Sequence, residues 1–123
     1  MNDDVRKALL AGGVCDITTT GRKSGEARRI EIRLHHIDGK LYLSGQPGRR
    51  SWYANLLADP AFTIHLKRDV MADVPARAVP VQDPTERRQV FVKMLDNVGR
   101  PEQLEDRMTK SPLVQLVVDL GQG

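Results

Sequence analysis

The stretch Thr18 to Arg29, "TTTGRKSGEARR", concentrates residue types that can bind an anion. Its twelve positions hold two glycines, four small hydroxyl residues and four basic side chains. Gly21 and Gly25 permit positive φ angles and close backbone approach to a ligand, and successive amides in such a turn can form an anion-binding nest. Arginine adds full charge and binds phosphate or carboxylate through two hydrogen bonds. A solvated hairpin loop is the alternative interpretation, because charge-rich turns are common.

A second basic loop follows, with the sequence "GQPGRR" at residues 45–50. Gly45, Gly48, Arg49 and Arg50 lie directly before a predicted helix start at Ser51. Helix N-termini attract anions through their unpaired amides and the helix dipole. Two such loops in one small chain could together hold an elongated anionic molecule.

The predicted helix after this loop carries two further candidate residues. Trp52 is the only tryptophan, and it either anchors the helix in the core or packs beside a planar ligand. Asn55 lies one turn later on the same face. Its amide either contacts the ligand or satisfies nearby backbone groups.

The sequence gives little indication of a metal site or of a catalytic nucleophile. His35 and His36 are neighbours on a predicted strand and point to opposite faces, and His65 is isolated. No histidine has metal-ligand or nucleophile–base spacing, so we expect no metal. Cys15 is the only cysteine, which excludes an internal disulfide. There is no P-loop and no nucleophile elbow, so an enzyme of this sequence would depend on a bound cofactor for its chemistry.

Length and composition favour one globular domain over residues 1–123. The chain has a mass of 13.8 kDa, 40% hydrophobic and 28% charged residues, and a formal net charge of +3. That charge favours anionic ligands, but an aromatic content of 4% provides few surfaces for base stacking, so we expect no nucleic-acid partner. We expect no signal peptide and no membrane span of ~20 apolar residues, and therefore a cytoplasmic protein.

Hydrophobic periodicity predicts a strand-rich chain with a few helices. Alternation and β-branched runs predict strands, and Asp38-Gly39 predicts a tight hairpin. Asp83 as N-cap, Pro84 at the first helical position and Gly99 at the end bound the clearest helix. The expected strands are 14–18, 29–37, 41–44, 61–67, 76–81 and 113–120, and the other expected helices are 4–10, 51–58 and a short one within 100–111.

These elements predict a small α+β barrel. Short hairpins between consecutive strands favour an antiparallel sheet. Because few helices are available to cover about six strands, the sheet buries its core best by curling into a barrel. Pro75 and Pro80 should restrict the strand near them to an edge or place them at its ends.

Three stretches together carry a family resemblance. "ITTTGRKSGEARRIEI", "DGKLYLSGQPG" and "SWYANLLADPAFTIHLK" follow in this order between Ile17 and Lys67. They resemble the deazaflavin-dependent nitroreductase family, the split-barrel flavin and deazaflavin oxidoreductases that use coenzyme F420. The resemblance implies a split β-barrel with F420 in a groove, FMN being the alternative cofactor.

The resemblance also implies which residues face the cofactor. The GRKSG loop and the arginine after it would face the phosphate and acidic tail, and the next strand would pass the ring. The loop after the hairpin would line the cofactor, and the following helix would close the groove. The implied residues are, in that order, Arg22, Lys23, Ser24, Gly25 and Arg28; Ile30, Glu31 and Ile32; Ser44, Gly45, Gly48 and Arg49; and Trp52 and Asn55.

Two departures from the family bear on the activity. Family members have a longer second loop with a lysine, which Arg49 or Arg50 would replace here. Members that reduce nitro compounds carry tyrosines towards the C-terminus, whereas this chain has only Tyr42 and Tyr53. We therefore expect an F420-dependent reductase that passes hydride to a small conjugated acceptor, namely a quinone, enone or nitro compound, with no catalytic residue assigned.

Other functions stay open at this stage. A non-catalytic binder of deazaflavin, FMN or an acidic lipid is the main alternative, and a basic nucleic-acid module is a weaker one. By analogy with other split barrels, a homodimer is also expected.

Overall fold

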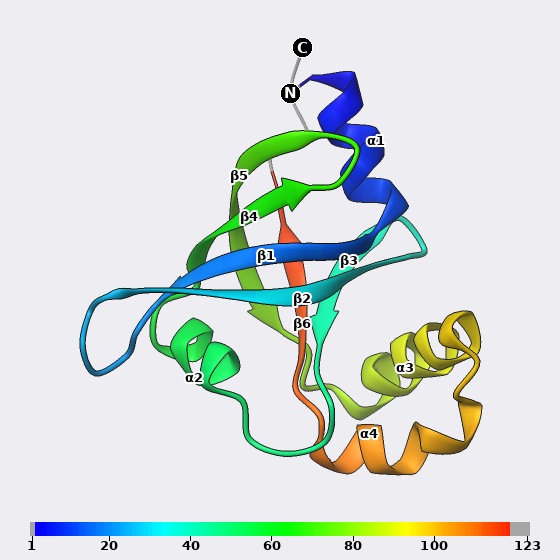
Figure 1. The fold of residues 1–123 in the computed structure, drawn as a ribbon. Helices are drawn as coiled ribbons and strands as arrows, with labels where there is room; N and C mark the ends of the chain where they lie inside the picture. The colour runs from blue at the N-terminus through cyan, green and yellow to red at the C-terminus, as the bar shows by residue number, and fades with distance from the viewer. Residues whose placement is uncertain (1, 119–123) are drawn as a thin grey trace.

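A closed barrel of six antiparallel strands forms the body of the protein. The computed structural model describes residues 2–118, and the strand order around the barrel is β1-β2-β3-β6-β5-β4 (Figure 1). The elements in chain order are α1 (Asp3–Ala11), β1 (Gly13–Thr20), β2 (Ala27–Ile37), β3 (Lys40–Ser44), α2 (Ser51–Ala58), β4 (Ala61–Lys67), β5 (Met71–Pro80), α3 (Pro84–Val98), the 3-10 turn Pro101–Gln103, α4 (Leu104–Lys110) and β6 (Leu113–Val117).

The predicted α+β split barrel is thus confirmed, and most local signals act as expected. Asp38 and Gly39 both have positive φ in the β2–β3 hairpin, as a tight primed turn requires. Asp83 Oδ2 accepts a hydrogen bond from Glu86 N at the start of α3, and Gly99 ends that helix in the left-handed conformation. β6 ends at Val117, and residues 119–120 of the expected last strand lie outside the described residues.

β5 is longer than its sequence indicates. It begins at Met71 rather than near residue 76, and Pro75 lies inside it. β6 pairs only with Arg77–Pro80 of β5, whereas β4 pairs with Met71–Arg77. Pro75 therefore lies where, among the described residues, one side of the strand has no partner, and a proline is tolerated there.

The core has two parts that lie on opposite sides of the barrel wall. The inner cluster fills the barrel and includes Ile17, Leu43 and Ile64. The outer cluster packs α3 against β2, β3 and β6, through Tyr42, Phe91 and Leu113 among others. Val90, Phe91, Met94 and Leu95 of α3 are buried, whereas Val98 is 41% exposed. Val98 lies in the last turn, where it lines a pocket rather than the core.

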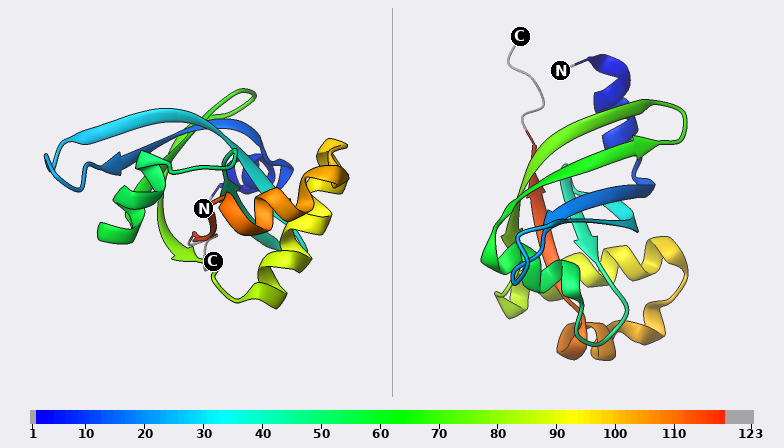
Figure 2. Two further views of the ribbon diagram at one scale, coloured as in Figure 1. Left: turned by 90° about the horizontal axis from the view of Figure 1, so that it is seen from below. Right: turned by 60° about the vertical axis from the view of Figure 1, so that its left-hand side comes forward.

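The pairing of β2 leaves part of the strand open. Its residues 27–34 pair with β1, but pairing with β3 begins only at Leu34. Residues 27–33 therefore have no partner strand on their second side among the residues described. α2 lies beneath one end of the β1–β2 hairpin, and α3 and α4 lie beneath the other, as the view from below also shows (Figure 2).

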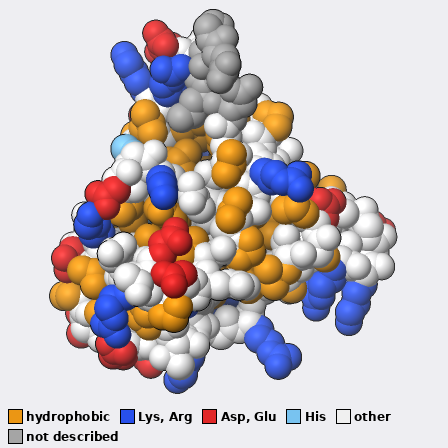
Figure 3. Space-filling view, turned by 180° about the vertical axis from the view of Figure 1, so that it is seen from behind, with side chains coloured by type: hydrophobic (Ala, Val, Ile, Leu, Met, Phe, Trp, Pro, Cys, Tyr) orange, Lys and Arg blue, Asp and Glu red, His pale blue; other side chains and the backbone are white. Residues whose placement is uncertain are grey.

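The rear face of the barrel mixes charged and hydrophobic side chains. From behind, hydrophobic side chains show between separate acidic and basic groups (Figure 3). Met71 and Val79 of β5 and Val117 of β6 are exposed. No helix in residues 2–118 has both the length and the apolar character needed to cross a bilayer.

Candidate functional site

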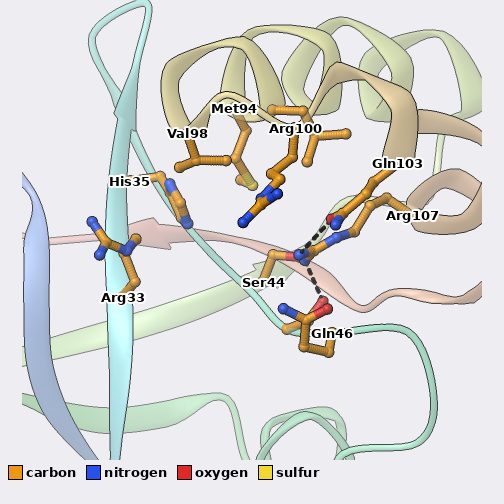
Figure 4. Close-up of a pocket in the computed structure, with 11 residues that line it drawn as sticks. Arg33, His35, Ser44, Gln46, Met94, Val98, Arg100, Gln103 and Arg107 are labelled. Atoms are coloured by element: carbon orange, nitrogen blue, oxygen red, sulfur yellow. Dashed lines mark hydrogen bonds between the residues drawn. The ribbon is translucent and has the colours of Figure 1, made fainter.

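Two pockets lie along β2, on either side of its open edge. The loop pocket has a volume of about 400 Å³ and lies between the 21–24 turn, β2 and α2. The helix pocket has a volume of about 380 Å³ and lies between β2, the end of β3, α3 and α4 (Figure 4). Arg28 and Ile30 line the first, and Arg33 and His35 line the second. Ile30 and Arg33 are roughly 10 Å apart along an extended strand.

The turn that forms the loop pocket is held by its own backbone. Gly21 N donates to Glu26 O at 2.8 Å, and Gly25 N donates to Gly21 O at 2.8 Å. Glu26 N donates to Ser24 Oγ at 3.1 Å. An anion nest requires free backbone N–H groups. These three N–H groups already have partners, so they are not available to an anion. The positive charge of this pocket comes from its side chains.

Asn55 fastens this turn to α2. Its Oδ1 accepts a hydrogen bond from Arg22 N at 3.1 Å, and its Nδ2 donates to Thr19 Oγ1 at 3.1 Å. The side chain lines the pocket but is only 4% exposed. Of the two interpretations of Asn55, the structure supports the one in which its amide satisfies neighbouring groups. Asn55 thereby positions the loop that carries the charge.

The remaining surface of the loop pocket is basic and apolar. Arg22 and Lys23 are exposed and form no salt bridge within residues 2–118, while Arg28 lies 3.6 Å from the exposed Glu26. Trp52 packs in the inner core at 7% exposure and also lines the pocket. Ile30 is 36% exposed, so a ligand here would cover apolar surface that water otherwise contacts.

Several of the implied cofactor residues lie elsewhere. The Glu31 carboxylate accepts a hydrogen bond from Lys67 Nζ at 2.5 Å, on the other face of β2 from Ile30. Lys67 also bonds Asp16, and together with Arg29 it lowers the pKa of that carboxyl. Ile32 packs against the inner core. The others that line neither pocket are Gly25, Gly48 and Arg49.

Ser44 and Gly45 line the helix pocket rather than the loop pocket. Ser44 Oγ donates to Pro112 O at 2.7 Å, and Gly45 O accepts from Arg107 at 2.6 Å. Gly48 N donates to Lys110 O at 3.0 Å. These bonds hold the 45–50 loop against α4 and its C-terminal end. They also direct Arg107 into the pocket beside Gly45.

The helix pocket holds charged residues that the sequence alone did not single out. Arg33, Arg100 and Arg107 line it with His35, and the Arg100 side chain points into the space between His35 and Arg107 (Figure 4). Burial, with the nearby charges of Arg33 and Arg107, lowers the pKa of His35 to about 4. His35 is therefore neutral at pH 7. No local motif links these residues, because only the fold brings α3, α4 and β2 together.

The other titratable residues named from the sequence have structural surroundings. His65, expected to be isolated, has Nδ1 2.7 Å from Asp73 Oδ1 and Nε2 2.6 Å from Thr18 Oγ1. Burial raises the pKa of the Cys15 thiol to about 11, which makes it unreactive. Within the described part of the chain, no three His, Cys, Asp or Glu side chains are arranged to hold a metal ion.

Comparison with known proteins places this geometry in context. The family model described as F420H(2)-dependent quinone reductase matches residues 5–118. Among curated proteins, no significant match is found.

Solved structures with the same fold carry different descriptions. A putative pyridoxamine 5'-phosphate oxidase from Listeria innocua superposes with a TM-score of 0.70 at 11% identity, over 95% of this chain and 92% of that one. An F420-H2 dependent reductase, FDR-A, gives 0.59 at 20% identity, over 85% and 93%. A domain-swapped dimer gives 0.56 at 21% identity, over 94% and 95%.

Replacing Asn55 with alanine should destabilise the loop pocket. The change removes one buried and one partly buried hydrogen bond and leaves Thr19 Oγ1 and Arg22 N without their partner. We expect the free energy of unfolding to fall by about 1–3 kcal/mol, measured by urea denaturation. The control is Asn97→Ala at an exposed position of α3, which should cause no loss. Equal stability of the two variants would contradict the fastening role.

The depressed pKa of His35 predicts an acid sensitivity. Its folded-state pKa of about 4 lies below the ordinary value of 6.5, so between these values the unfolded chain binds more protons than the folded one. The free energy of unfolding should therefore fall as pH drops from 6.5 towards 4. In urea titrations across this range, His35→Gln should flatten the slope, whereas His36→Gln, at the exposed neighbour, should retain it. An unchanged slope in His35→Gln would refute the assignment.

Proposed function

Because this chain belongs to the F420H(2)-dependent quinone reductase family, it is an F420-dependent reductase, and we propose where it holds the cofactor and what it reduces. In this proposal the phosphate and acidic tail of F420 lie in the loop pocket, and the ring follows the open edge of β2. The acceptor is a small conjugated molecule such as a quinone, enone or nitro compound. The observation that carries the proposal is a basic pocket next to an unpaired strand edge.

The loop pocket fits the charged part of this cofactor. F420 carries a phosphate and a glutamate tail, which require positive charge. Arg22 and Lys23 provide it without a competing carboxylate, and no acidic side chain lines the pocket among the described residues. Charge-assisted hydrogen bonds from arginine to phosphate are among the strong ones. Arg28 adds a third cation on the same side of β2 as Ile30.

The open edge of β2 fits the ring. In an antiparallel pair, alternate residues direct their N–H and C=O groups away from the partner strand. Over residues 27–33 those groups find no second strand among the residues described, so they can bond the polar edge of a planar ligand. Ile30 and Trp52 offer apolar contact beside them. Glu31 contributes its backbone here, since its side chain bonds Lys67.

The protein contributes binding, orientation and exclusion of water. Bound reduced F420 supplies a hydride, and reduction of a quinone to its hydroquinone then takes one further proton. No Asp, Glu, Tyr or Cys of the described residues lines either pocket. We therefore propose that water is excluded during hydride transfer and that this proton comes from solvent afterwards. Fixing the reactants side by side supplies the main advantage, because it removes the entropic cost of their encounter.

Self-association is also proposed. A structure with this fold is described as a domain-swapped dimer, and Met71, Val79 and Val117 expose apolar surface on β5 and β6. Burial of such surface is a general driving force for association. These observations support a homodimer formed through the β5–β6 wall.

Removing the charge of the turn should weaken cofactor binding. Arg22→Ala combined with Lys23→Ala should raise the Kd for F420 about 30-fold, corresponding to ~2 kcal/mol, because charge-assisted hydrogen bonds are worth about 1.5–3 kcal/mol each. Fluorescence titration of the deazaflavin measures this. A charge-matched control is Arg88→Ala with Lys93→Ala on α3, away from the loop pocket. Unchanged affinity in the folded double variant would refute the loop pocket as the tail site.

Turnover tests the reaction itself. Purified protein mixed with reduced F420 and a panel of quinones, enones and nitro compounds should oxidise the cofactor, seen as loss of the reduced absorbance. Parallel titration with FMN should show weaker binding than with F420. Tight binding of F420 without acceptor-dependent oxidation would instead indicate a non-catalytic binder.

A further inference from the structure

The helix pocket contains positive charge with no counter-charge. Arg33, Arg100 and Arg107 line it, and no Asp or Glu of the described chain does so. Nor does any of the three form a salt bridge within residues 2–118, whereas Arg29, Arg88 and Lys93 each have a carboxylate partner. Like charges in one small cavity repel each other, so a bound anion would stabilise the arrangement.

The Arg107 guanidinium has neither a carboxylate partner nor a full set of hydrogen bonds among the described residues. One terminal nitrogen donates to Gly45 O at 2.6 Å and the other to Gln103 Oε1 at 3.4 Å, both drawn in Figure 4. Its Nε is buried and has no hydrogen-bond partner. Burial, together with the charge of Arg50, lowers the pKa of this guanidinium. A buried donor without a partner is rare and calls for an explanation such as a missing ligand.

Besides burial, the lowered pKa of His35 reflects the same positive charge in the helix pocket. Arg33 and Arg107 both act to lower its pKa, so their charges reach the interior of the pocket from two sides. Arg100 extends into the same space from the connection between α3 and α4 (Figure 4). Arg100 and Arg107 therefore lie about one volume, and Arg33 lines its margin on β2.

The wall of the pocket formed by α3 is apolar. Met94, Leu95 and Val98 of α3 line it, with the first two buried in the protein. Gln46, Gln103 and Ser44 supply polar groups at the margin. A cavity of about 380 Å³ with an apolar wall and a cationic wall matches a small ring that carries an acidic substituent.

We propose that the helix pocket is the acceptor site and that it selects acceptors bearing an anionic group, held by Arg100, Arg107 and Arg33. The proposal rests on the proposed function, because it takes the cofactor ring to lie against the open edge of β2 at residues 30–32. Arg33 and His35 follow directly on the strand, and the helix pocket that they line is on the opposite face of β2 from Ile30. The tail then lies at Arg22 and Lys23, beyond the other end of the ring. The substrate class is thus a conjugated carbonyl compound with a carboxylate or sulfonate.

A pair of quinones that differ in charge tests this selection. The probes are a naphthoquinone sulfonate and the corresponding methyl-naphthoquinone, each reduced with F420H2 by wild-type protein and by Arg100→Gln. Loss of one charge-assisted contact should lower kcat/KM for the sulfonate about 10-fold or more and leave the methyl compound within about twofold. Arg33→Gln, at a second exposed and unpaired cation, should act in the same direction. The control is Arg77→Gln on β5, which lines neither pocket.

Binding measurements separate this proposal from the proposed function. Calorimetric titration of the naphthoquinone sulfonate into protein loaded with oxidised F420 should show about 10-fold weaker binding for Arg100→Gln, whether or not turnover occurs. If F420 binds but neither quinone is reduced, the proposed reaction fails while this titration still decides the anion site. Equal losses for both quinones, or equal sulfonate binding by variant and wild type, would overturn the proposal. Weaker binding of F420 itself to Arg100→Gln would overturn it too, by placing the cofactor tail there.

Discussion

The unequal pairing of β2 is the constraint on which the rest of the site depends. The strand is eleven residues long, and β1 covers most of it, whereas β3 pairs only with its last four residues. The barrel closes through β3 and β6 and leaves the first part of β2 with an open side. Backbone hydrogen-bonding groups need partners, so an unpaired edge inside a folded domain is a natural place for a planar polar ligand. Both pockets lie against this same strand, one before and one after its middle.

Charge is distributed along β2 in two separate groups. Outside the pockets, Asp16, Glu31, Arg29 and Lys67 neutralise one another in a surface network. Inside the pockets, Arg22 and Lys23 at one end and Arg100 and Arg107 at the other have no salt-bridge partner among the described residues. Exposed ion pairs contribute little stability, so the difference bears mainly on ligands. The pockets retain the charge that the outer wall cancels, which favours anions at both ends of the site.

Much of the fold and half of the site follow from local sequence. Alternation, the Asp38-Gly39 turn and the caps of α3 are short-range signals, and they act through backbone geometry that any fold must satisfy. The loop pocket brings Arg22 and Lys23 close to Trp52. The motifs between Ile17 and Lys67 already predict that these residues lie in one site. The helix pocket has no such signal. Arg100 follows α3 and Arg107 lies in α4, both late in the chain, and their approach to His35 depends on long-range packing of α3 on β2. Likewise, strand alternation places the Glu31 side chain on the opposite face of β2 from Ile30. The family resemblance alone implies that both residues face the cofactor.

The measurement that tests this account most directly is amide hydrogen exchange with and without F420. The central claim is that the cofactor lies along the open edge of β2 with its tail at the 21–24 turn. The account predicts slower exchange on F420 binding at alternate amides of residues 27–33, whose N–H groups face away from β1, and little change in β4 and β5. Unchanged exchange throughout residues 27–33, with protection elsewhere in the protein, would contradict it.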